Sequence, residues 1–83
     1  IRIVQVPLRD LVYQDMLSKI NEDTDMETVQ SMVRYLTQHG MVETREAALL
    51  MQMITGLFQS ETLAAQERVQ MLKTMILTLE NFR

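Results

Sequence analysis

Apolar residues recur at helical spacing along most of this chain, and polar breaks divide the pattern into segments. Residues 1–6 (Ile-Arg-Ile-Val-Gln-Val) differ from the rest, because they are β-branched and nearly alternating, which indicates a short strand or extended arm. The predicted fold is all-α: three to four short helices in a small bundle, with a short extended N-terminal arm, in a dimeric state. Residues 1–83 form a single domain, with helices over about residues 8–20, 25–39, 45–59 and 62–81.

Residues typical of helix ends support these boundaries. Pro7 suits the first turn of a helix, where its missing N–H costs nothing. Thr24 and Glu27 have the spacing of a capping box, and Thr44 is the expected N-cap of the third helix. Gly40 suits the left-handed position that follows a helix C-terminus. This glycine predicts the sharpest boundary in the chain.

The apolar pattern also predicts which helix lies at the centre. The segment 45–59 is apolar around most of its circumference, which is typical of a buried helix. Gly56 inside it costs about 1 kcal/mol relative to alanine, which indicates close approach of a neighbouring helix or a kink. The last helix carries a heptad seam at Ala65, Val69, Leu72, Ile76 and Leu79. On the first helix we expect an inward face of Leu8, Leu11, Val12, Met16, Leu17 and Ile20.

The composition favours association with another chain. The 83 residues are 47% hydrophobic but only 5% aromatic, and short chains bury a small share of their surface. There is no cysteine and only one histidine, so neither disulfides nor a structural zinc site can compensate. We therefore predict a homodimer or a complex with a protein partner. Burial of a leucine or methionine is worth roughly 1.5–3 kcal/mol, so exposed apolar helix faces would be expensive to leave uncovered.

The residues that could carry chemistry form no catalytic or ligand-binding pattern. His39 is expected to cap the second helix, and no nucleophile lies at an informative spacing from it. The acidic residues between Glu22 and Glu27 lack the central glycine of a calcium loop. We predict no catalytic, metal or cofactor-binding residue, no cofactor and no enzymatic activity.

Eight methionines are the most distinctive feature of the composition. Flexible thioethers fill irregular gaps in cores, which is the expected role of most of them, and they also suit adaptable binding surfaces. Met41, in the loop after Gly40, and Met71, at the edge of the last helix, are the two that we expect at an interface. The full set of predicted interface residues is Ile1, Ile3, Val6, Met41, Val69, Met71, Leu72, Ile76, Leu79 and Phe82.

Charge argues against nucleic acid as the main partner. The net charge is −3, and the basic residues are scattered, whereas nucleic-acid binders usually carry a basic stripe. No apolar run approaches the length of a membrane span. The chain does not begin with methionine, so the true N-terminus stays open. The lack of cysteine favours a cytoplasmic location.

From Glu27 onward the layout resembles the AriR (YmgB) family of enterobacterial biofilm regulators and connector proteins. The pattern consists of a helix ending at Gly40, then Val42, a helix start at Thr44-Arg45-Glu46, and two apolar helices. Their matching positions are Leu49, Met53, Ile54 and Leu57, followed by Val69, Leu72 and Ile76. The resemblance implies a dimeric regulator that modulates a phosphorelay or a transcription programme by protein contact.

Three functions are compatible with this sequence. The first is a small regulatory or adaptor protein that acts by protein–protein contact, such as a connector in signalling or transcription. The second is a dimeric DNA-binding transcription regulator, with Arg34, Arg45 and Arg68 as phosphate contacts. The third is a structural or chaperone-type subunit of a bacterial or phage assembly, to which residues 1–6 would donate a strand.

Overall fold

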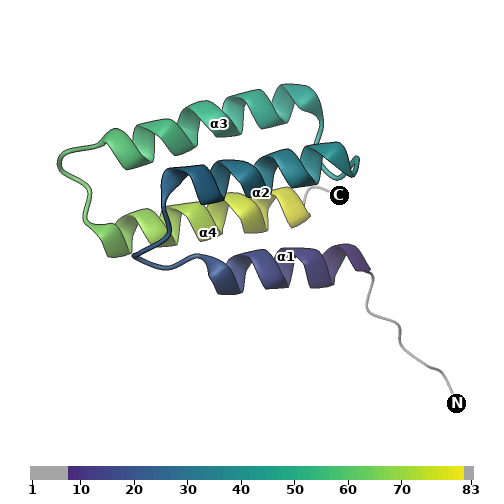
Figure 1. Cartoon of the computed structure of the whole chain (residues 1–83), viewed down its shortest axis with the longest axis horizontal. Helices are drawn as coiled ribbons and strands as arrows, with labels where there is room; N and C mark the ends of the chain where they lie inside the picture. The colour runs from purple at the N-terminus through teal and green to yellow at the C-terminus, as the bar shows by residue number, and fades with distance from the viewer. Residues whose placement is uncertain (1–7, 82–83) are drawn as a thin grey trace, which may run out of the picture.

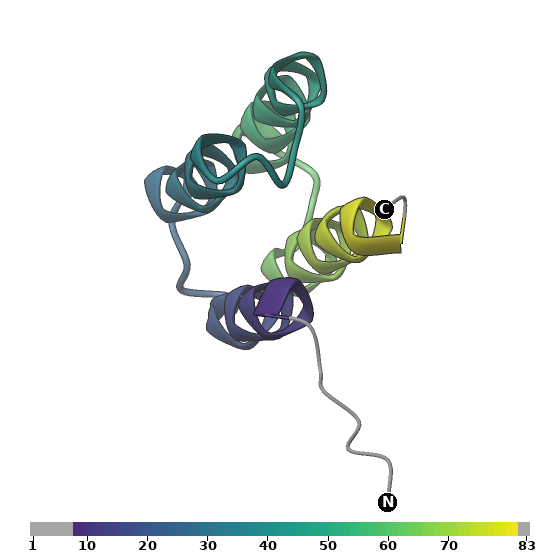
Figure 2. The same cartoon turned by 90° about the vertical axis from the view of Figure 1, so that its right-hand side faces the viewer.

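The computed structural model describes residues 8–81, which form four helices and no strand. The helices run antiparallel to their neighbours in the chain (Figure 1), and an end-on view places them at the corners of a small bundle (Figure 2). Helix α2 packs against α3, α1 against α4, and α3 against α4. The predicted all-α fold is confirmed, whereas the predicted arm over residues 1–6 lies outside the described residues. The helices are α1 (Leu8–Lys19), α2 (Met26–Gln38), α3 (Thr44–Gln59) and α4 (Ala65–Asn81).

One hydrophobic core joins all four helices. No polar or charged residue of the described chain is buried in it. The largest fully buried side chains include Tyr13 of α1, Leu36 of α2, Ile54 of α3 and Leu72 of α4. Burial of apolar surface is the main favourable term in folding, so these side chains hold the bundle together. The buried set comprises Tyr13, Met16, Ile20, Val29, Met32, Val33, Leu36, Val42, Ala47, Leu50, Ile54, Leu72, Ile76 and Leu79.

The end of α2 is built as its sequence predicts. Gly40 has φ +69°, the left-handed conformation that favours glycine. The amide of Gly40 donates to the carbonyl of Thr37 over 3.1 Å, and that of Met41 donates to Leu36 over 2.8 Å. These two bonds make a Schellman motif, which satisfies terminal carbonyls and turns the chain towards α3.

The start of α2 differs from its prediction. Asp25, and not Thr24, is the N-cap, and its carboxylate accepts a 2.8 Å hydrogen bond from the amide of Thr28. Hydrogen bonds from Thr28 lower the pKa of Asp25 below its usual value. The Thr24 hydroxyl instead donates to the carbonyl of Lys19, so it closes the turn after α1. Glu27 pairs with Arg34 over 2.8 Å. The capping box assigned to Thr24 and Glu27 was therefore wrong, because two adjacent oxygen side chains competed for the cap.

The starts of α3 and α4 also differ from their predictions, by one residue and by three residues. Thr44 belongs to α3, and its N-cap is Glu43, whose amide donates to Glu46 over 3.3 Å in a capping box. Helix α4 begins at Ala65, not at residue 62, because Glu67 accepts a 3.3 Å bond from the amide of Ala64. In both cases a glutamate three residues after the cap reaches back and fixes the first turn.

Two arginines tie distant parts of the bundle together. Arg9 donates to the carbonyl of Glu80 over 2.6 Å and lies 5.2 Å from the centre of the Tyr13 ring. Its cation therefore meets the negative end of the α4 dipole. Arg68 lies 4.7 Å from the centre of the Phe58 ring and donates to the carbonyl of Glu22 over 3.3 Å. Each arginine thus fixes one end of α4 against the rest of the chain.

Two predictions about burial are corrected. Leu8 and Leu11, expected to face inward, are 80% and 48% exposed, because the inward face of α1 is centred on Tyr13 and Met16. Helix α3 is not buried on all sides: Leu49 and Met53 lie on its surface. With four helices at the corners of a bundle, each helix keeps one outward face, whatever its composition.

Candidate dimerization surface

Large apolar side chains lie exposed on two separate faces of the described bundle. One group lies along α1 and α2, and the other along α3 and α4. Scattered surface apolar residues are normal, but contiguous ones usually mark an interaction site. We therefore compare the hollows that members of these two groups line: Leu8, Leu11 and Tyr35 line one, and Met53 and Met71 line another, whereas Leu49 and Leu77 lie outside both. The exposed large apolar residues are Leu8, Leu11, Tyr35, Leu49, Met53, Met71 and Leu77.

The hollow between α3 and α4 has a volume of about 530 Å³, and we call it the methionine groove. On α3, Met53 and Gly56 follow Leu49 at helical spacings of four and three, so all three share one face. On α4, Met71 and Met75 are four residues apart. No ionisable residue lines this groove. Its lining is Met53, Gly56, Leu57, Gln70, Met71, Thr74 and Met75.

The fold of the single chain does not explain why a glycine occupies position 56 in this groove. It lies inside α3 at a cost of about 1 kcal/mol relative to alanine. A Cβ atom added at Gly56 would meet no neighbouring atom within 4 Å, so no helix of this chain approaches it closely. The close approach that the sequence suggested is therefore absent within one copy. The position is open to a second chain.

The hollow between α1 and α2, which we call the tyrosine groove, has a volume of about 680 Å³ and a mixed character. Leu8, Leu11 and Tyr35 supply exposed apolar surface to it. Asp15 and Lys19 form a 2.9 Å ion pair on its wall, and Thr28 and Ser31 add hydroxyl groups. Covering this groove would remove charged and polar groups from water, which is unfavourable unless the partner supplies matching groups.

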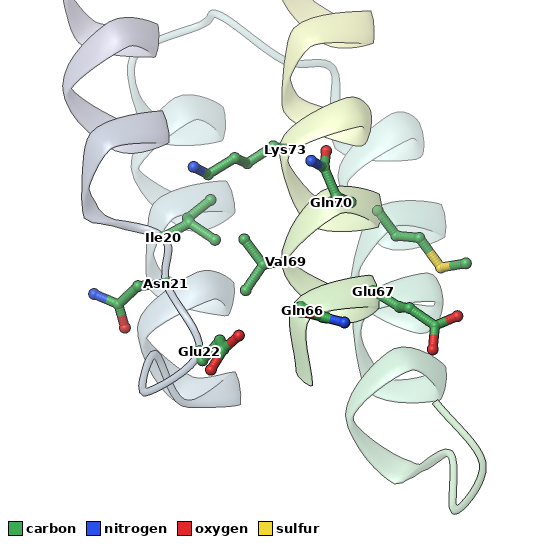
Figure 3. A pocket seen from close by; sticks show the side chains of 9 residues that line it. Ile20, Asn21, Glu22, Gln66, Glu67, Val69, Gln70 and Lys73 are labelled. Atoms are coloured by element: carbon green, nitrogen blue, oxygen red, sulfur yellow. The ribbon is translucent and has the colours of Figure 1, made fainter. Parts of the chain in front are cut away.

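A third hollow, of about 710 Å³, lies between the loop after α1 and the first turns of α4 (Figure 3). In it the side chains of Ile20 and Val69 point towards one another, and Glu22 and Gln66 are among the polar residues of the lining. Among residues 8–81, no three histidine, cysteine, aspartate or glutamate residues are grouped so as to hold a metal ion. Over the same range, no helix combines the length and apolar character needed to cross a membrane.

The structure divides the predicted interface residues that it describes into exposed, half-buried and buried ones. Met71 is 44% exposed and lines the methionine groove. Met41 and Val69 are half-buried and pack against the core. The heptad seam of α4 was predicted to face a partner, but its main residues are core residues of the single chain. The buried seam residues are Leu72, Ile76 and Leu79, and the predicted residues outside the described range are Ile1, Ile3, Val6 and Phe82.

Sequence reasoning missed Leu49, Met53 and Gly56 as surface residues. They lie at positions i, i+4 and i+7 of one helix, a spacing that places them on one face. This spacing did not identify a surface, because another face of the same helix is apolar as well. Only the arrangement of the neighbouring helices shows which of the two faces the chain itself covers.

Comparison with known families agrees with a surface for self-association. The family model of the CtsR C-terminal dimerization domain matches residues 9–77, which include most of the four helices. The chain belongs to this family. Membership of the CtsR dimerization-domain family supports a role in the self-association of a regulator. Neither a curated protein nor a solved structure matches the chain. The resemblance to the AriR family stays a prediction.

Proposed function

We propose that this CtsR-type domain joins two copies of a regulatory protein, and that the face around the methionine groove is the surface that joins them. The observation that carries this proposal is an apolar groove, free of ionisable side chains, whose lining includes a glycine with open space where a side chain would lie. Family membership supports self-association but does not say which face of the bundle is used.

The chemistry of the groove favours a dry, close contact. Met53 and Met71, which line it, are 54% and 44% exposed, so association would remove much apolar surface from water. Leu49, beside the groove on the same face of α3, is 59% exposed. Such burial is worth roughly 25 cal/mol per Å². The hydroxyl of Thr74 donates to the carbonyl of Gln70 over 2.8 Å, so its hydrogen already has a partner. Closing this surface would therefore leave few polar groups without hydrogen bonds.

Twofold symmetry adds a condition that the groove meets. In a symmetric dimer the same patch meets itself, so it must offer both projections and hollows. Met53 and Met71 project, while Gly56 leaves space for an approaching helix. Unbranched thioethers can adjust their rotamers to fill irregular gaps between two copies. This self-complementarity favours a second copy over an unrelated partner.

The further role that fits this proposal is regulation by protein contact, as in an adaptor or connector, with no catalytic step.

The contacts of the arginines disfavour direct DNA binding by this chain. Arg34 is paired with Glu27, and Arg68 stacks on Phe58 and donates to the Glu22 carbonyl, so both are already engaged. Arg45 alone of the three predicted phosphate contacts remains exposed without a described partner.

Sedimentation equilibrium of the wild type and of Met53→Glu tests the proposal. We expect a dimer for the wild type. In Met53→Glu the dissociation constant should rise at least about a hundredfold, since an uncompensated charge buried at an interface costs several kcal/mol. Circular dichroism should show unchanged helicity, because the side chain at position 53 lies on the surface.

Leu11→Glu is the matched control, since Leu11 is similarly exposed but lies in the tyrosine groove. It should leave the dissociation constant within about threefold of the wild type. A monomeric wild type at high micromolar concentration would contradict the dimerization role. A dimer that survives Met53→Glu but is lost in Leu11→Glu would transfer the interface to the tyrosine groove.

A further inference from the structure

We infer that Met53 and Met71 form an oxidation site, at which a peroxide converts the thioethers to sulfoxides and thereby weakens self-association. This inference rests on the proposed function, because both side chains border the groove assigned to the second copy. It goes beyond that function by adding a chemical signal to which the dimer would respond.

The exposure of the methionine residues singles out these two. The chain contains no cysteine, so its methionines carry all of its sulfur chemistry. Met53 and Met71, at 54% and 44% exposure, are the exposed methionines of the described chain, and both lie in one groove. The others are buried or half-buried against the core: Met16, Met26, Met32, Met41, Met51 and Met75.

The reaction needs only the thioether and the peroxide. The sulfur lone pair attacks one peroxide oxygen, the O–O bond breaks, and a sulfur–oxygen bond forms. The sulfur is oxidised to the sulfoxide and the peroxide is reduced, with its second oxygen leaving as water when the oxidant is hydrogen peroxide. Methionine sulfoxide reductases reverse this change, so the modification can act as a switch.

A sulfoxide is polar, and the methionine groove is poorly equipped to bind it. Because the Thr74 hydroxyl hydrogen is directed to the Gln70 carbonyl, the Gln70 amide is the lining side-chain donor left for two sulfoxides. In a separated copy, water solvates both. In the dimer the two N–H groups of each Gln70 would have to reach both sulfoxides of its groove at once, and a sulfoxide that they do not reach would be buried without a partner, which is unfavourable. Oxidation therefore stabilises the separated copies relative to the dimer.

Association and oxidation should also compete. If the second copy covers the groove, Met53 and Met71 can react only while the copies are apart. Raising the protein concentration should then slow their oxidation, while a half-buried thioether outside the groove, such as Met41, should react at a rate independent of concentration. This protection follows from mass action between dimer and monomer.

The experiment treats the wild type with hydrogen peroxide, quenches it with catalase, locates the sulfoxides by peptide mapping, and measures the dissociation constant before and after. We expect sulfoxide first at positions 53 and 71, and a dissociation constant at least about tenfold higher. For the double variant Met53→Leu/Met71→Leu, the dissociation constant measured before the treatment should stay unchanged after it, because leucine cannot be oxidised. Treatment of the oxidised wild type with methionine sulfoxide reductase should restore the original value.

Met16→Leu/Met32→Leu is the matched control, since it removes two core sulfurs and should keep the wild-type sensitivity. An unchanged dissociation constant in protein carrying both sulfoxides would overturn the inference while leaving the proposed function intact. Equal loss of the dimer in Met53→Leu/Met71→Leu would also overturn it. A wild type that is monomeric before oxidation would instead refute the proposed function on which it rests.

Discussion

The two faces of helix α3 have similar composition and different surroundings. Towards the bundle, Leu50 is 9% exposed and Ile54 2% exposed. On the other face, Leu49 is 59% exposed and Met53 54% exposed. A side chain at position 49 differs from its neighbour only in direction. The comparison shows that one helix can serve two interfaces, one within the chain and one between chains.

This arrangement explains why so small a domain carries so much aliphatic surface. A short chain cannot surround a helix completely, because four helices around one core leave each of them an outward face. An apolar outward face then either promotes aggregation or serves as an interface. Membership of a dimerization-domain family favours the second interpretation.

The largest expected effect is on the free energy of unfolding, and one pair of substitutions compares the two faces of α3. Leu50→Ala should lower the free energy of unfolding by about 2–5 kcal/mol, because it leaves a cavity in the core. Leu49→Ala should change it by less than about 0.5 kcal/mol when measured on dilute, monomeric protein. Urea unfolding followed by circular dichroism makes this measurement.

The order should reverse for association. Leu49→Ala should raise the dissociation constant by about tenfold, since each copy loses apolar surface that the dimer buries. Leu50→Ala should change it little at a temperature where the variant remains folded. Equal effects of the two substitutions on unfolding would show that α3 does not have one inner and one outer face.

A smaller effect of opposite sign is expected at Gly56. Gly56→Ala should stabilise the separated chain by about 1 kcal/mol, because alanine is the better helix former and open space surrounds the added methyl group. The same methyl group should weaken the dimer several-fold if a helix of the second copy passes close to it. Thermal unfolding and sedimentation equilibrium together give both signs. If Gly56→Ala raised the unfolding temperature and did not weaken the dimer, Gly56 would not lie in the contact between the two copies.

The smallest effect concerns a cap that lies on neither face of α3. The pKa of Asp25 is lowered by its hydrogen bonds from Thr28, so the ionised carboxylate is the form that stabilises the fold. This stabilisation is present above the unfolded-state pKa and is lost as the pH falls through the lowered folded-state pKa. Between about pH 5 and pH 2, the urea midpoint of the wild type should therefore fall more steeply than that of Asp25→Asn. Parallel pH profiles for the two proteins would contradict this role of the cap.

Much of the fold could be predicted from the sequence because its signals are local. Gly40 marks the end of α2 by its own conformational freedom, and helical spacing gives each of the four helices. The predicted starts were less accurate. Near Thr24 and Asp25, and again near Glu43 and Thr44, several side chains could cap the same helix, and only the folded geometry shows which one does.

The candidate site was harder to predict, because its location depends on tertiary contacts. The heptad seam of α4 predicted an interface, but the same spacing also suits an intramolecular core, where Leu72 and Ile76 lie. Met71, which was predicted at an interface because it lies at the edge of that seam, is exposed on the single chain, as an interface residue must be. Because α3 is apolar on both sides, periodicity alone could not show that Met53 is exposed while Ile54 is buried.

Maleimide labelling at two positions tests the central claim most directly, because the natural chain has no cysteine. In Met53→Cys the introduced thiol should react more slowly as the protein concentration rises through the range of dimer formation. In Leu11→Cys the rate should stay constant, since that position lies in the tyrosine groove. Constant labelling at position 53 together with protection at position 11 would contradict the assignment of the α3–α4 face to the second copy.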